Sequence, residues 1–79
     1  MPFVNIKLIE GGLDHDERQE LIKRVTDAVV SVYGEGVRSV TWAACEDVRS
    51  GEWGIAGQPI TTADVKALRG QTAKEPVPA

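Results

Sequence analysis

The sequence predicts a small α+β domain built on a β-α-β unit. An alternating apolar segment near the start, an amphipathic segment of helical period after it and a further segment of strand character together favour this class. With 79 residues the chain has room for one domain. We therefore expect a single domain over residues 1–79, with a short C-terminal hairpin and with residues from about 60 to 79 as an extension or arm.

The first strand is predicted at Phe3–Ile9, where the residues alternate in the strand period of two. One side of this strand is wholly aliphatic, with Val4, Ile6 and Leu8. The glycine pair Gly11-Gly12 follows and permits the positive φ values that a tight turn requires. The strand is therefore expected to end in a turn.

An amphipathic helix is predicted from Asp14 or Asp16 to Tyr33, because either aspartate can accept hydrogen bonds from the free N–H groups of the first turn. The side expected to pack against the sheet carries Leu21, Ile22, Val25, Ala28, Val29 and Val32. The side expected to face solvent carries Arg18, Glu20, Lys23, Arg24 and Asp27. Gly34 is placed for a left-handed C-cap.

A second strand is predicted from Val37 or Ser39 to Glu46, with neither side strongly polar. Strand, helix and strand form a crossover that should be right-handed, with parallel strands. One helix covers only one face of such a sheet. We expect other copies of the chain to cover the second face.

The last part of the chain is predicted to hold a turn structure and a short helix. Three glycines around Trp53 indicate a hairpin or a packed loop at residues 47–59. Thr62-Ala63-Asp64 can cap a helix that runs to Arg69. Residues 71–79 are expected to form a mobile or swapped arm.

Composition excludes several classes of function. The net charge of -3, from nine basic against twelve acidic residues, argues against nucleic-acid binding. One histidine and one cysteine disfavour a metal cage, and we expect no cofactor. The start lacks a signal-peptide pattern, and no segment approaches the roughly 20 apolar residues that span a bilayer. We expect a cytoplasmic protein whose thin core is completed by oligomerisation.

Pro2 is the strongest candidate for chemistry. Removal of the initiator methionine leaves Pro2 with a secondary amine at the chain start. An α-amino group has an ordinary pKa of about 7.7–8.0, and an apolar pocket lowers that pKa because desolvation disfavours the charged form. Such an amine can act as a general base at neutral pH. The alternative interpretation is that Pro2 merely starts the chain.

Three motifs carry a resemblance to a known family: the start Met-Pro-Phe-Val-Asn-Ile-Lys-Leu-Ile-Glu-Gly, the helical Glu20–Val25 with Ala28-Val29, and the loop Gly51–Gly57. With these motifs in order, the chain resembles short-chain members of the tautomerase superfamily, close to 4-oxalocrotonate tautomerase. The resemblance implies protomers that pair into a four-stranded sheet, commonly three such dimers in a hexamer. It also implies that Pro2 moves a proton of an enol or dienol acid to give the keto isomer, without metal or cofactor.

Members of this family hold the substrate carboxylate and carbonyl with arginines and line the pocket with an aromatic residue. Trp53 stands at the aromatic position, although packing is an equally good interpretation of this residue. Gly12 and Thr41 stand where the arginines would be. A less acidic or more apolar carbonyl compound than the usual dicarboxylate is therefore the expected substrate.

Arg38 and Arg49 are candidates to supply positive charge from displaced positions, with solvated surface arginines as the alternative interpretation. Beside Pro2 as the catalytic residue, we expect the substrate to be bound by Trp53, Arg38, Thr41 and Ile9. Two other functions stay open. One is a hydratase, dehalogenase or decarboxylase of the same superfamily that needs a carboxylate such as Glu52, and the other is a non-catalytic oligomeric binding module.

Overall fold

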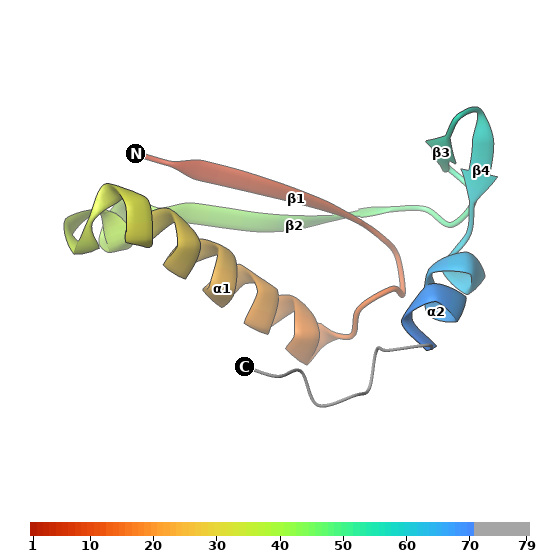
Figure 1. The fold of residues 1–79 in the computed structure, drawn as a ribbon, viewed down its shortest axis with the longest axis horizontal. Helices are drawn as coiled ribbons and strands as arrows, with labels where there is room; N and C mark the ends of the chain where they lie inside the picture. The colour runs from red at the N-terminus through yellow and green to blue at the C-terminus, as the bar shows by residue number, and fades with distance from the viewer. Residues whose placement is uncertain (71–79) are drawn as a thin grey trace. The chain divides into compact units, whose positions relative to one another are not determined.

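The computed structural model describes residues 1–70, so the arm predicted at 71–79 lies outside the described residues. In chain order the elements are β1 (Phe3–Ile9), α1 (His15–Tyr33), the 3-10 helix η1 (Glu35–Val40), β2 (Trp42–Val48), β3 (Trp53–Ile55), β4 (Gln58–Ile60) and α2 (Thr62–Gly70) (Figure 1). The chain divides into two compact units. The first comprises residues 1–8 and 13–47, and the second comprises residues 9–12 and 48–70 of the described chain.

In the first unit, β1 and β2 form a parallel pair with α1 on one face. The N–H of Trp42 donates to the carbonyl of Pro2 over 3.0 Å, which joins the starts of the two strands. Further along, the side chains of Asn5 and Lys7 donate to the carboxylate of Glu46. Residue numbers therefore rise together in both strands, and Figure 1 shows the two arrows pointing the same way. The predicted β-α-β topology is confirmed.

The second strand begins later than predicted, at Trp42 rather than Val37 or Ser39. Residues 35–40 form η1 instead, whose 3-10 turns are closed by short-range backbone hydrogen bonds such as Thr41 N–H to Arg38 C=O over 3.3 Å. Gly34 has the predicted positive φ of 104°, but its ψ of 157° is extended. The chain therefore leaves α1 through an extended glycine and not through a left-handed cap.

Asp14 is the N-cap of α1 and forms a capping box with Glu17. The Asp14 carboxylate accepts from the N–H of Glu17 over 2.8 Å, and the Glu17 carboxylate accepts from the N–H of Asp14 over 3.0 Å. Two backbone donors at the helix start are thereby satisfied. These contacts identify Asp14, rather than Asp16, as the N-cap of α1.

Replacement of Asp14 by alanine is expected to lower the free energy of unfolding by about 1 kcal/mol, because the N–H of Glu17 loses its acceptor. Urea unfolding followed by circular dichroism at a fixed protein concentration measures the loss. Asp16→Ala, in the same first turn, is the matched control. Equal midpoints for the two variants would contradict the assignment of the cap.

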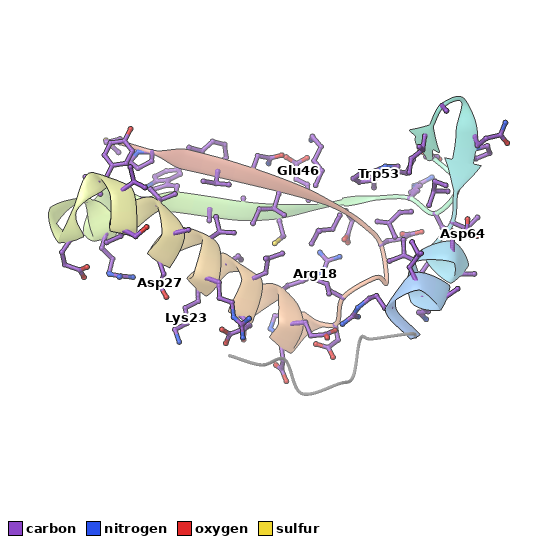
Figure 2. All side chains as sticks on the ribbon, viewed as in Figure 1. Arg18, Lys23, Asp27, Glu46, Trp53 and Asp64 are labelled. Atoms are coloured by element: carbon purple, nitrogen blue, oxygen red, sulfur yellow. The ribbon has the colours of Figure 1, made fainter. Side chains whose placement is uncertain are left out.

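The packing face of α1 differs from the prediction at its two ends, and Ala28, also expected to pack, is exposed. Val30 is 5% exposed, whereas Val32, expected against the sheet, is 86% exposed because it lies in the last helical turn with the exposed Tyr33. Arg18, expected in solvent, is an ion-pair partner of Asp47 in β2, and its side chain is 20% exposed. Figure 2 shows Arg18 reaching from α1 toward β2. A long arginine stem can lie on an apolar face when its charged tip finds a carboxylate.

The second unit contains the predicted hairpin and the predicted short helix. Strands β3 and β4 are antiparallel, with Trp53 opposite Ile60 and Ile55 opposite Gln58. Between them Ala56 (φ 51°) and Gly57 (φ 80°) form a two-residue turn, for which positive φ at both positions is the favoured geometry.

The core of the described chain is thin, as its length predicts. Within residues 1–70, the apolar side chains that are almost fully buried are Ile9, 6% exposed, and Val30. Phe3 and Trp42 are 61% and 64% exposed. None of the helices within residues 1–70 combines the length and the apolar character that a membrane span needs.

Candidate active site

Pro2 is held at the start of β1 by the sheet. Its carbonyl accepts the hydrogen bond from the N–H of Trp42, and its side chain is half-buried. Met1, which precedes it, is 85% exposed. The Pro2 nitrogen is a tertiary amide while Met1 is attached, and it becomes a basic amine once Met1 is removed.

Thr41 immediately precedes the residue that pairs with Pro2. Its hydroxyl donates to the carbonyl of Val37 over 2.7 Å, and its N–H donates to the carbonyl of Arg38. Thr41 therefore closes η1 and begins the turn into β2. It lies at the end of the sheet where Pro2 lies.

Arg38 is held by two carboxylates in the same unit. Its Nε and Nη2 donate to Glu35 over 2.7 and 3.4 Å, and its Nη1 donates to Asp27 over 2.7 Å. These contacts raise the pKa of Arg38 above its ordinary value, with Glu35 as the larger cause, and Arg38 lowers the pKa of Glu35 in turn. A guanidinium has five N–H donors, and within residues 1–70 three of those of Arg38 are engaged and two are left for other acceptors.

The face of the sheet away from α1 carries a polar cluster and two aromatic residues. Glu46 accepts from Asn5 and from Lys7, the latter over 3.3 Å, and these contacts lower the pKa of Glu46, with Asn5 as the larger cause. Figure 2 shows Glu46 on this face. Because side chains alternate along a strand, Phe3 and Trp42 share the face with Glu46.

Two predicted binding residues, Ile9 and Trp53, belong to the second unit. Trp53 is half-buried at the first position of β3, and the hairpin base is closed by the N–H of Gly51 donating to the carbonyl of Ile60 over 2.9 Å. Ile9 is buried, and its carbonyl accepts from the N–H of Gly12 over 3.2 Å. Of the predicted site residues, Pro2, Arg38 and Thr41 thus belong to the first unit, and Ile9 and Trp53 belong to the second.

Two further candidates lie in the turn before the hairpin. Arg49 and Glu52 are joined by a backbone hydrogen bond of 2.9 Å from the N–H of Glu52, and both side chains are exposed. Within the part of the chain that the structure describes, no group of three or more histidine, cysteine, aspartate or glutamate residues could hold a metal ion.

Sequence reasoning missed a polar network in the second unit. The carboxylate of Glu10 accepts from the N–H of Ser50 over 3.2 Å, and the carbonyl of Glu10 accepts from the hydroxyl of Thr62 over 2.6 Å. The segment Thr62-Ala63-Asp64 is expected from sequence to cap α2, and in the structure Asp64 does so together with Thr61, with which it exchanges hydrogen bonds. Thr61 and Thr62 are adjacent, and the sequence does not show which of them caps the helix. It therefore does not show that Thr62 is left to bind Glu10 and Ser50.

The chain is similar to tautomerases over most of its length. Residues 2–63 match the family model described as tautomerase enzyme. The probable tautomerase K2 of Dickeya dadantii is 33% identical over 61 residues, which cover 77% of this chain and 90% of that protein. A probable tautomerase of Helicobacter pylori is 36% identical over 62 residues, which cover 76% and 90%.

Solved structures agree with this similarity. The crystal structure of DmpI from Helicobacter pylori matches with a TM-score of 0.66 at 31% identity, over 75% of this chain and 95% of that one. A 4-oxalocrotonate tautomerase isozyme structure from Methylibium petroleiphilum matches with a TM-score of 0.66 at 28% identity, over 81% and 97%. The chain belongs to the tautomerase family and is of the 4-oxalocrotonate tautomerase type.

Proposed function

We propose that the protein is a cofactor-free tautomerase in which Pro2, freed by removal of Met1, is the general base. The observation that carries this proposal is that the tautomerase match begins at residue 2, the position that becomes an amine. The half-buried setting of Pro2 supports a lowered amine pKa, because burial disfavours the protonated form.

The proposed reaction converts an enol acid to its keto isomer. The lone pair of the Pro2 nitrogen accepts the enol proton, and the electrons of that O–H bond form the carbonyl π bond. The electrons of the C=C bond then take the proton back from the prolinium at carbon. One residue therefore serves as base and then as acid, and the proton count balances without a cofactor.

The proposed binding residues are Trp53 and Ile9 as apolar wall, with Thr41 and Arg38 near the reacting atoms. Two carboxylates orient Arg38 and compensate its charge, while two of its N–H donors have no acceptor in the described part of the chain. Such a guanidinium suits the polarisation of a carbonyl better than the binding of a second carboxylate. We therefore propose a substrate with one carboxylate, such as phenylenolpyruvate, rather than a dicarboxylate.

Arg38→Ala is expected to lower kcat/KM for phenylenolpyruvate about tenfold, the effect of losing one hydrogen bond from a charged donor. Initial rates of ketonisation measure the loss. Arg24→Ala is the matched control, because Arg24 also pairs with a carboxylate, Glu20, on the exposed side of α1. If Arg49→Ala reduces the rate and Arg38→Ala does not, the binding role belongs to Arg49.

A panel of substrates tests the proposed function. We expect ketonisation of phenylenolpyruvate and, more slowly, of 2-hydroxymuconate. Turnover of unsaturated, halogenated or β-keto acids alone, with loss on Glu52→Gln, would instead identify a hydratase, dehalogenase or decarboxylase. Binding without turnover would identify a non-catalytic module.

We also propose that residues 1–79 form one tautomerase-like domain that works in the cytoplasm as a homo-oligomer, with a hexamer preferred over a dimer or trimer. The exposed aromatic side chains of Phe3 and Trp42 on an uncovered sheet face support association, since a two-stranded sheet is marginal alone. Light scattering measures the mass of the assembly, and a monomer would contradict this proposal.

A further inference from the structure

Helix α2 packs against the turn that follows β1, within the second unit. The guanidinium of Arg69 donates from Nη1 to the carbonyl of Gly12 over 2.6 Å, near the C-terminal end of α2. At the other end of the helix, the hydroxyl of Thr62 donates to the carbonyl of Glu10. Helix α2 therefore donates hydrogen bonds to two carbonyls of the same turn, those of Glu10 and Gly12.

The same network reaches the base of the Trp53 hairpin. The N–H of Thr62 donates to the hydroxyl of Ser50 over 2.9 Å, and the N–H of Ser50 donates to the carboxylate of Glu10. Ser50 directly precedes Gly51, whose N–H closes the hairpin. Turn, hairpin base and α2 thus share one set of hydrogen bonds.

Side chains of α2 approach the backbone of the turn closely at its two glycines, Gly11 and Gly12. Gly12 is buried, and a Cβ built on it would come within 3.3 Å of both the Ile9 carbonyl and a methyl group of Val65 in α2. Gly11, at φ +75°, would place a Cβ 3.0 Å from the methyl of Thr62. A Cβ at either position would push its neighbour by a few tenths of an ångström, and the positive φ of Gly11 further disfavours a side chain there.

Most of this helix lies beyond the family match. The match ends at residue 63, whereas α2 runs to Gly70 and Arg69 is near its end. We propose that α2 is a clamp that fixes the turn 10–12 and the base of the Trp53 hairpin, with Arg69 and Thr62 as positioning residues that set how tightly substrate binds. The part that concerns substrate rests on the proposed function, whereas the part that concerns order in the turn and hairpin does not.

Hydrogen–deuterium exchange of the full chain tests the clamp without any substrate. Arg69→Ala and Thr62→Val should each speed exchange of the amides in residues 10–12 and 50–55 by about fivefold, because a hydrogen bond of the clamp is lost. Arg69→Lys and Thr62→Ser, which keep a donor, should restore most of the protection. Lys66→Ala, on the same helix with an exposed side chain, is the matched control.

Kinetics test the functional part. Arg69→Ala and Thr62→Val should each raise KM for phenylenolpyruvate about fivefold. Both should leave kcat and its pH dependence within twofold of the parent, because neither residue is proposed to touch the reacting atoms. Unchanged exchange in both variants would overturn the clamp. Faster exchange with an unchanged KM would overturn its role in substrate binding, and faster exchange in a protein without turnover would overturn the proposed function and leave the clamp standing.

Discussion

Replacement of Pro2 by alanine is expected to lower kcat for phenylenolpyruvate ketonisation about a hundredfold. Loss of a positioned general base costs about 10²–10⁴ in rate, and the lower end applies because alanine also ends in an amine once Met1 is removed. That amine is primary and lacks the ring that fixes the nitrogen relative to the backbone. Stopped-flow measurement of enol decay under saturating substrate gives kcat directly.

The control for this variant is an unchanged fold. Circular dichroism and light scattering should match the parent, since the carbonyl of residue 2 still accepts from Trp42. An intact mass must show that Met1 is absent from both proteins. Equal kcat in parent and variant would mean that Pro2 is not the base.

Protein that retains Met1 is expected to show no tautomerase activity above the solution rate. With Met1 attached, the Pro2 nitrogen is an amide whose lone pair is delocalised into the carbonyl, so it cannot accept a proton near neutral pH. Preparations from cells with limited methionine aminopeptidase provide mixtures of both forms. Intact mass gives the processed fraction, and the rate should be proportional to it.

Treatment of a retained-Met1 preparation with purified methionine aminopeptidase is the control. Activity should rise in step with the loss of the methionine mass. Full activity in protein that keeps Met1 would rule out the Pro2 amine as the base.

The elements with a clear period were predictable. Phe3–Ile9 was confirmed at both ends because its alternation is regular and a glycine pair follows it. The predicted start of β2 was wrong because Val37 and Val40 are β-branched, and β-branched residues favour strands. The 3-10 helix η1 depends instead on short-range backbone hydrogen bonds, which leave no apolar period in the sequence. Val32 fits the apolar side of the predicted helix, but the apolar pattern does not reveal that the last turn of α1 is exposed.

The residues of the candidate site also divide into those that the sequence points to and those that it does not. Pro2 is a candidate from sequence because the start Met-Pro-Phe-Val-Asn-Ile-Lys resembles that of tautomerases, and its role as base stays a prediction. The network of Glu10, Ser50 and Thr62 could not be, because it joins polar side chains 40 and 52 residues apart in sequence. Such contacts are set by how the turn, hairpin and helix meet within the second unit. The engagement of Arg38 by Glu35 and Asp27 was missed for a different reason: these partners are only three and eleven residues away, but the contacts depend on η1, which the sequence did not predict.

The most direct test is a ¹⁵N NMR titration of the Pro2 nitrogen in protein labelled with ¹⁵N-proline, with the signal assigned by its loss in Pro2→Ala. We predict that this nitrogen titrates as a secondary amine with a pKa below about 7.7–8.0, the ordinary α-amino range. We also predict that kcat/KM for phenylenolpyruvate falls about tenfold per pH unit below that same pKa, because the protonated amine cannot accept the enol proton. A nitrogen with an amide shift that does not titrate, in protein that still converts enol to keto form, would contradict the role of Pro2 as the base.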